Sequence, residues 1–394
     1  MTRSRSDARG PVLTAGRRTA IGTAGHAFAG SDVVALTAPV LDAVARAAAP
    51  LDRPVDDVII GNCMGPGGNI ARVSALAAGL GDGVPGMTVD RQCGSGLDAV
   101  LLAASRVRAG DAELVLAGGA ESASTAPWRF WPPDGDAAPQ RYERAPFTPT
   151  GSPDPGMGES ADELARMRGI SRQRQDEYAA RSHELSFAAR ERGRFDAEIV
   201  PVDAVTRDER PRAGLDARRL SRLRPSFGAD GTATAGNSCG VSDGAAAVAV
   251  CTESAARGAG LPYLRVVAGA VAADRSDLPG LGTSAAVERL LRRPAVADRG
   301  VAMSDVDAVE ITEAFASVVL AAVDDLDLRL DTVCAEGGAI GLGHPWGASG
   351  TILLLRLMSR MLCPAIDPAP RYGLAACAIG GGQGLAVLLE NPER

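Results

Sequence analysis

The sequence predicts an α/β protein built from two similar halves, with a loop-rich segment inserted into the first half. Strand patterns alternate with helical patterns over residues 11–121 and again from residue 231 onwards, which is typical of helices packed on a sheet. Short motifs recur in the same order in the two parts, which indicates an internal repeat. The chain of 394 residues is also too long for one ordinary hydrophobic core.

The first half predicts a regular succession of strands and helices. Apolar residues at helical spacing cover 36–48, where Pro39 is acceptable only near the first turn. Residues 56–61 predict a strand that runs into a glycine-rich turn, and residues 70–80 predict a helix. Residues 113–121 predict a buried strand that ends in glycines, which completes an α/β unit.

The stretch 89–100 joins a strand-like approach to a helix, and Cys93 lies at the junction. Gly94 and Gly96 allow a sharp turn, and the apolar run 97–104 predicts a buried helix. Free N–H groups and the dipole at a helix N-terminus favour a thiolate and can bind an oxyanion. Cys93 is therefore a candidate nucleophile, and the alternative is a small buried cysteine in a tight turn.

Residues 122–230 differ from the parts on either side. Tryptophans and prolines mark turns, and a charged helical run covers 160–192. We expect a loop-rich insertion that covers the substrate site. Arginines are concentrated in 207–224; most are expected on the solvated surface and a few facing a phosphorylated cofactor.

From residue 231 the α/β pattern returns, and it repeats features of the first half. The strand at 57–61 matches 307–311, and the Cys93 turn matches the glycine-rich turn at His344, which also precedes a helix. Residues 117–119 likewise match 379–381. Two similar halves would place Cys93 and His344 on equivalent turns that face each other across a shared centre.

This pairing predicts acyl transfer through a thioester. A nucleophilic cysteine needs a base or a cation nearby, and the chain has only three histidines. His26 and His183 lie in ordinary polar surroundings, whereas His344 lies among glycines that allow close backbone approach. A Cys–His pair with oxyanion-binding amides suits acyl transfer, and a cysteine protease is the alternative.

Charge and cysteine usage exclude several other classes. A net charge of −7 disfavours nucleic acid and anionic membranes as partners. Seven scattered cysteines without CxxC pairs predict neither a disulfide framework nor a metal site, and they fit a reducing cytoplasm. The N-terminus lacks the apolar core of a secretory signal, and no stretch offers 18 uncharged apolar residues for a membrane span.

Taken together, the motifs resemble those of the thiolase family over nearly the whole chain, from Arg18 to Gly384. The motifs besides the Cys93 turn are Thr234-Ala-Gly-Asn237 with Asp243-Gly-Ala-Ala, Glu313-Ala-Phe-Ala316, Gly337-Gly-Ala-Ile340 with Gly343-His-Pro345 and Gly347-Ala-Ser-Gly350, and Gly380-Gly-Gly-Gln-Gly384. The resemblance implies two thiolase halves in five αβαβα layers. The expected units are a first half at 1–121, a covering loop domain at 122–230, completion of the first half at 231–270, and a second half at 271–394.

The resemblance also implies roles for particular residues. Cys93 would receive the acyl group and His344 would activate it. The amides of Cys93 and Gly380 would form one oxyanion site, and His344 with Thr312 would border another. The residues at the positions where the family contacts coenzyme A are Arg224 and Thr252. A coenzyme A thioester would be the substrate, with no permanently bound cofactor, and the chain would form a homodimer or homotetramer.

Three positions depart from the family pattern. Thr312 replaces the asparagine of Asn-Glu-Ala-Phe, and Gly156 replaces the histidine before Met157. Ala378 stands where the family has its second catalytic cysteine, and Cys377 is one residue earlier. A shift of one residue in a strand turns a side chain to the opposite face, so the base that moves the α-proton of the second substrate is altered.

The expected activity is that of a thiolase-family acyltransferase that makes or cleaves a 3-ketoacyl thioester. One alternative retains acylation at Cys93 but changes the second half-reaction, to decarboxylative condensation or to transfer onto another nucleophile. Another is a non-catalytic scaffold that binds acyl-CoA, against which the intact Cys93 and His344 argue. The acyl carrier would be coenzyme A or an acyl carrier protein.

Overall fold

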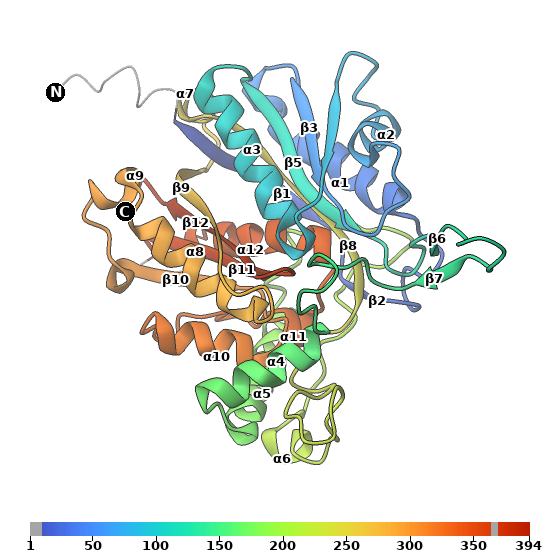
Figure 1. Cartoon of the computed structure of the whole chain (residues 1–394). Helices are drawn as coiled ribbons and strands as arrows, with labels where there is room; N and C mark the ends of the chain where they lie inside the picture. The colour runs from blue at the N-terminus through green and yellow to red at the C-terminus, as the bar shows by residue number, and fades with distance from the viewer. Residues whose placement is uncertain (1–9, 364–368) are drawn as a thin grey trace.

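The computed structural model describes residues 10–363 and 369–394, in which strands and helices alternate as the sequence predicts (Figure 1). The elements of the first half are β1 (Pro11–Arg18), β2 (Gly22–Thr23), α1 (Val33–Ala48), β3 (Asp57–Gly61), α2 (Ile70–Ala77), β4 (Gly86–Val89), α3 (Ser95–Ala109), β5 (Leu114–Glu121), β8 (Ser242–Thr252) and α7 (Glu253–Gly258). Those of the second half are β9 (Leu264–Ala273), α8 (Gly282–Leu291), α9 (Pro294–Ala297), β10 (Val306–Ile311), α10 (Ala316–Asp325), α11 (Ala339–Leu342), α12 (Trp346–Met361), β11 (Tyr372–Ile379) and β12 (Gln383–Glu390).

The two halves share one strand order, which confirms the internal repeat. The first half runs β1-β8-β5-β3-β4, with β2 paired to β8, and the second runs β9-β12-β11-β10. A parallel bridge between Val309 and Val333 stands beside β10, in the place that β4 occupies beside β3. The equivalent pairs of the two halves, β3 with β5 and β10 with β11, are both parallel. The turns at Cys93 and His344 therefore precede equivalent helices, α3 and α12.

Three hydrophobic cores separate the layers. One core packs α1 and α2 on the outer face of the first sheet, and another packs α8 and α10 on the outer face of the second. The core between them contains residues from both sheets together with α3 and α12. This arrangement confirms the expected five layers, with α3 and α12 in the middle layer (Figure 1).

The two sheets are joined along one edge. Strand β1 pairs with β9 at only two positions, Val12 with Arg265 and Leu13 with Leu264. Strand β9 otherwise pairs with β12 over most of its length and so belongs to the second sheet. The expected unit boundary at residue 270 was therefore too late, because the chain passes from one half to the other between α7 and β9.

The inserted segment contains β6 (Arg129–Trp131), β7 (Gln140–Tyr142), α4 (Met157–Arg168), α5 (Arg172–Glu191) and α6 (Ala217–Leu220). The expected single helical run is two helices, because Gly169 ends α4 in a left-handed conformation (φ 64°) and the Ser171 side chain caps α5. Both helices pack against the outer core of the second half. The β6–β7 hairpin projects away from the layers (Figure 1).

Helix α1, with the short turn that follows it, is long and apolar enough over Val33–Leu51 to span a membrane by length and composition. Its apolar face instead packs on the first sheet, where Leu36, Leu41 and Val44 are fully buried. The helix begins three residues earlier than predicted, because Asp32 caps it, so Pro39 lies in the helix interior.

Candidate active site

Cys93 lies on a strained turn between β4 and α3. Gln92, directly before it, has a positive φ of 48°, a conformation that is uncommon for residues other than glycine. The Gln92 amide donates to Asp90 Oδ1 (2.7 Å), and the Ser95 hydroxyl donates to the Gln92 carbonyl (2.6 Å). These bonds hold the 3₁₀ turn Gln92–Gly94, which leads directly into α3.

The two glycine-rich turns meet in the middle layer. A Cβ atom on Gly96 would lie only 2.5 Å from the Gly347 carbonyl oxygen, and one on Gly350 would lie 2.6 Å from the Leu97 amide nitrogen. Only glycine permits so close an approach of two backbones. The structure thus brings the start of α3 and the start of α12 together, as the repeat predicts.

His344 is fixed in place by hydrogen bonds to its neighbours. Its amide donates to the Gly240 carbonyl (3.2 Å) and to the Ser242 hydroxyl (3.1 Å). Its Nδ1 atom lies 2.5 Å from the Ser349 hydroxyl, whereas Nε2 is buried and has no hydrogen-bond partner among the described residues. Burial lowers the pKa of His344 to about 4, so the ring is neutral near pH 7.

Cys93 opens into a cavity of about 210 Å³. Its walls combine apolar and polar side chains from both halves and from the inserted segment. The lining residues are Cys63, Met64, Gln92, Cys93, Arg129, Glu143, Arg144, Ala145, Phe147, Met157, Trp346 and Gly380. Gly380 and Cys93 thus line the same cavity, and its wall includes Trp346, two residues after His344.

The Cys93 thiol is protonated in the resting site, contrary to the expectation from its helix N-terminus. Burial raises the pKa of Cys93, and the nearby thiols of Cys377 and Cys239 raise it further. Desolvation outweighs the helix dipole here, because the hydration free energy that a thiolate loses on burial exceeds the electrostatic stabilisation that the dipole provides. Both the Cys93 thiol and the His344 ring are therefore neutral at rest.

Cys377 lies beneath the Cys93 turn and does not line the cavity. It is fully buried in the middle core, and its sulfur lies 3.6 Å from where a Cβ of Gly94 would stand. Ala378 faces the opposite side of β11 and packs against the outer core of the second half. Strand alternation therefore keeps Cys377 out of the cavity, without a bulge within β11.

Thr312 is buried at the end of β10, and its hydroxyl has no hydrogen-bond partner among the described residues. Thr312 and Ser349 line one small space of about 20 Å³. Ser349, which lines this space with Thr312, also contacts the His344 ring. A space of this size is on the scale of a single water molecule.

Two buried carboxylates, to which the sequence motifs gave no role, tie the elements of the site together. Glu121 accepts from the amides of Met64 (3.0 Å) and Gly347 (3.1 Å), which ties β5 to the start of α12. Glu313 accepts from the hydroxyls of Tyr178 (2.7 Å) and Ser182 (2.6 Å), which ties the inserted helix α5 to the second half. Burial raises the pKa of both carboxyls. The signal for both was an acidic residue at the end of an apolar strand.

The two residues expected to contact coenzyme A differ in their placement. Arg224 is exposed on the inserted segment, beyond α6. Thr252 instead caps α7, where its hydroxyl accepts from the Ala255 amide (3.3 Å). Thr252 and Ser242 are at opposite ends of the 11-residue strand β8, and Ser242 is the residue that contacts His344. At the usual rise per residue, the two ends are about 30 Å apart. The assignment of Thr252 is therefore corrected, and Arg224 stays a prediction.

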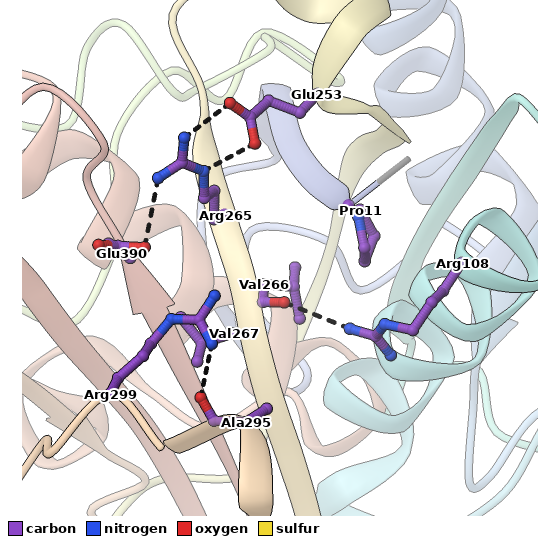
Figure 2. A pocket seen from close by; sticks show the side chains of 10 residues that line it. Pro11, Arg108, Glu253, Arg265, Val266, Val267, Ala295, Arg299 and Glu390 are labelled. Atoms are coloured by element: carbon purple, nitrogen blue, oxygen red, sulfur yellow. Dashed lines mark hydrogen bonds and ion pairs between the residues drawn. The ribbon is translucent and has the colours of Figure 1, made fainter. Parts of the chain in front are cut away.

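A larger cavity of about 430 Å³ lies at the seam between the halves and holds none of the predicted catalytic residues. Figure 2 shows Arg265 bridging Glu253 and Glu390 there, with Arg108 donating to the Val266 carbonyl (3.3 Å). The carboxylates thus neutralise much of its positive charge. The chemistry of its lining residues, rather than its size, makes the Cys93 cavity the candidate active site.

Comparisons with known proteins agree with this geometry. Residues 12–254 match the family model of the thiolase N-terminal domain, and residues 262–391 match that of the C-terminal domain. The chain is 39% identical to a putative acetyl-CoA C-acetyltransferase VraB of Staphylococcus haemolyticus, over 96% of this chain and 98% of that protein. It is also 39% identical to an acetyl-CoA acetyltransferase of Escherichia coli, with the same two coverages.

A solved structure supports the same conclusion. The crystal structure of the Bacillus anthracis acetyl-CoA acetyltransferase matches with a TM-score of 0.87 and 34% identity, over 97% of this chain and 98% of that chain. The matching fold, both family domains and relatives named as acyltransferases leave one interpretation. This chain belongs to the thiolase family and is an acyltransferase.

Proposed function

We propose that the protein forms an acyl-cysteine at Cys93 from an acyl-CoA and then makes or cleaves a 3-ketoacyl thioester. The supporting observation is the position of Cys93, which opens into a cavity at the start of α3 where the His344 turn meets it. Acyl-CoA would be a substrate, and no permanently bound cofactor is part of the proposal.

In the first step His344 acts as the base. Its Nε2 atom is the nitrogen left without a partner, so it is free to take the proton of the Cys93 thiol. The sulfur of Cys93 forms a bond to the thioester carbonyl carbon, the bond from that carbon to the coenzyme A sulfur breaks, and the proton passes to the departing sulfur. Because the thiol and the ring are both neutral at rest, proton transfer accompanies the attack.

The negative charge that develops on the carbonyl oxygen needs hydrogen-bond donors. The amides of Cys93 and Gly380 are the proposed donors, since both residues line the same cavity. Thr312 and His344 are the proposed border of a second oxyanion site. The unpaired hydroxyl of Thr312 supports this role, because it can orient a water toward the site.

A specific observation favours a second candidate function. Non-decarboxylative condensation needs a base that removes an α-proton, and the family's cysteine at that position is Ala378 here. Cys377 does not line the cavity. Loss of carboxylate from a malonyl partner would generate the carbanion without that base, so decarboxylative condensation, or transfer to another nucleophile, is the alternative. Product analysis with acetyl-CoA, malonyl-CoA and acetoacetyl-CoA in parallel separates these reactions.

A homodimer or homotetramer in the cytoplasm is also proposed. Strand β4 ends the strand order and pairs only with β3, so it leaves an open sheet edge. Met87 on β4 and Val73 and Leu76 on α2 are exposed large apolar side chains beside this edge. A second subunit would cover them, and light scattering that finds only monomer at micromolar concentration would contradict the proposal.

A further inference from the structure

The wall of the Cys93 cavity contains one guanidinium whose charge is not compensated. Arg129, at the start of β6, is half-buried, and its Nη2 atom donates to the Cys63 carbonyl (3.0 Å). Among residues 10–363 and 369–394, Arg129 forms no ion pair, and its Nε and Nη1 atoms have no hydrogen-bond acceptor there. The bond to Cys63 holds the cationic end of the side chain in the cavity, because Cys63 lines the same space.

The other two charged side chains of the cavity differ from Arg129. Arg144 is paired with Asp154 (3.0 Å) and lies over the Phe147 ring, so its charge is compensated. Glu143 is exposed, and water can solvate its carboxylate. The remaining wall is largely apolar, with Met64, Met157 and Trp346 among the lining residues. Arg129 is therefore the cation that a ligand in this cavity would meet without a competing partner.

A half-buried arginine beside apolar walls is matched best by a planar carboxylate, which accepts hydrogen bonds from the guanidinium fork. The phosphates of coenzyme A are poorly placed for this role. Their pantetheine arm separates them from the thioester sulfur, whereas Arg129 and the nucleophile line one cavity of about 210 Å³. The carboxylate must then belong to the acyl group itself, a few bonds from the thioester carbonyl.

We propose that the cavity binds dicarboxylic acyl thioesters and that Arg129 holds their free carboxylate. The inference rests on the proposed acyl transfer at Cys93 and specifies its substrate class. The carboxylate has two chemical sources, the far end of an acyl donor such as succinyl-CoA or the carboxylate of a malonyl partner. Both present the same group to the same guanidinium.

The test compares acyl transfer from succinyl-CoA and valeryl-CoA, which are similar in size but differ in charge. The wild type is expected to favour succinyl-CoA in kcat/KM by roughly tenfold or more, the scale of a charge-assisted hydrogen bond. Arg129→Gln should remove most of this preference and Arg129→Lys should retain part of it. Arg141→Gln is the matched control, because Arg141 is on the same hairpin but lies over the Trp128 ring, outside the cavity.

A second variant tests the sign of the effect. Glu143→Gln removes the negative charge that lines the cavity, so the preference for succinyl-CoA should rise, opposite to Arg129→Gln. A preference that falls in both variants contradicts recognition by Arg129. Malonyl-CoA consumption after acetylation of Cys93 separates the two sources. If Arg129→Gln slows malonyl-CoA consumption but leaves acyl transfer from succinyl-CoA unchanged, the carboxylate belongs to the condensing partner.

Binding measured without turnover separates this inference from the proposed function. Calorimetry on Cys93→Ala with succinyl-CoA and valeryl-CoA reports the carboxylate contact even where no acyl transfer takes place. Absence of any Cys93 adduct would overturn the proposed function, yet a succinyl-CoA preference that Arg129→Gln removes would still support the site. Equal affinity for the two thioesters, together with malonyl-CoA consumption that Arg129→Gln leaves unchanged, would overturn the inference alone.

Discussion

The Nδ1 atom of His344 lies 2.5 Å from the Ser349 hydroxyl, and this contact leaves Nε2 as the nitrogen free to meet a substrate or a thiol. Ser349 is on the first turn of α12, one turn beyond His344. The contact therefore fixes the ring by an element of the rigid middle layer, which is the kind of support that a general base requires.

Ser349→Ala should slow acylation of Cys93 by about fivefold to tenfold, the effect of one lost hydrogen bond on ring position. Ser349→Thr should restore most of the rate, because it keeps the hydroxyl. Single-turnover release of coenzyme A measures both. Ser105→Ala on the exposed side of α3 is the control, and a threonine variant as slow as the alanine variant would argue against a positioning role.

Burial of neutral His344 predicts an acid-sensitive contribution to stability. Its pKa is about 4 in the folded protein and about 6.5 when unfolded, so between these values the unfolded state binds the extra proton. Stability therefore rises with pH across this window and is lost as pH falls from 6.5 toward 4. As pH falls through this window, the free energy of unfolding of the wild type should decrease relative to that of His344→Gln by up to about 1.4 kcal/mol per pH unit. Urea titrations measure it, and parallel pH profiles would contradict the burial.

The protonated state of Cys93 predicts its reactivity. Because burial raises the pKa of this thiol, its alkylation by iodoacetamide should rise by about tenfold per pH unit between about pH 7 and pH 9. Peptide mass spectrometry can follow Cys93 separately from the other cysteines. A rate that is already on a plateau near neutral pH would instead indicate a resting thiolate paired with a cation.

Cys377→Ala tests the missing base. Since Cys377 lies under the Cys93 turn and outside the cavity, acylation and acetoacetyl-CoA thiolysis should both stay within about twofold of wild type, far below the loss of a general base. Wild-type thiolysis itself should be poor. Robust thiolysis that collapses in the variant, with acylation intact, would show that Cys377 reaches the substrate.

The sequence predicted the architecture because the repeat is visible in local patterns. The strands at 57–61 and 307–311 and the glycine turns before α3 and α12 contain enough information to predict that the starts of these two helices meet. Long-range features escaped it. The raised pKa of Cys93 depends first on its burial and then on neighbouring thiols distant in sequence. Arg129 becomes a cavity residue through its contact with the Cys63 carbonyl, 66 positions away.

Other corrections have equally physical reasons. Thr252 is the last residue of the apolar strand β8, and the direction of β8 places it at the end far from Ser242. The boundary at 270 failed because β9 pairs with β12 rather than completing the first sheet. Strand pairing is decided by non-local contacts, which a reading of local periodicity does not contain.

The central claim is that Cys93 accepts the acyl group with His344 as its base, and intact-protein mass spectrometry with acetyl-CoA tests it most directly. The wild type should gain one acetyl group, Cys93→Ser should lose or strongly weaken this adduct, and His344→Ala should form it on the order of 10²-fold more slowly. An adduct that persists unchanged in Cys93→Ser, or that forms in His344→Ala within about twofold of the wild-type rate, would contradict the account.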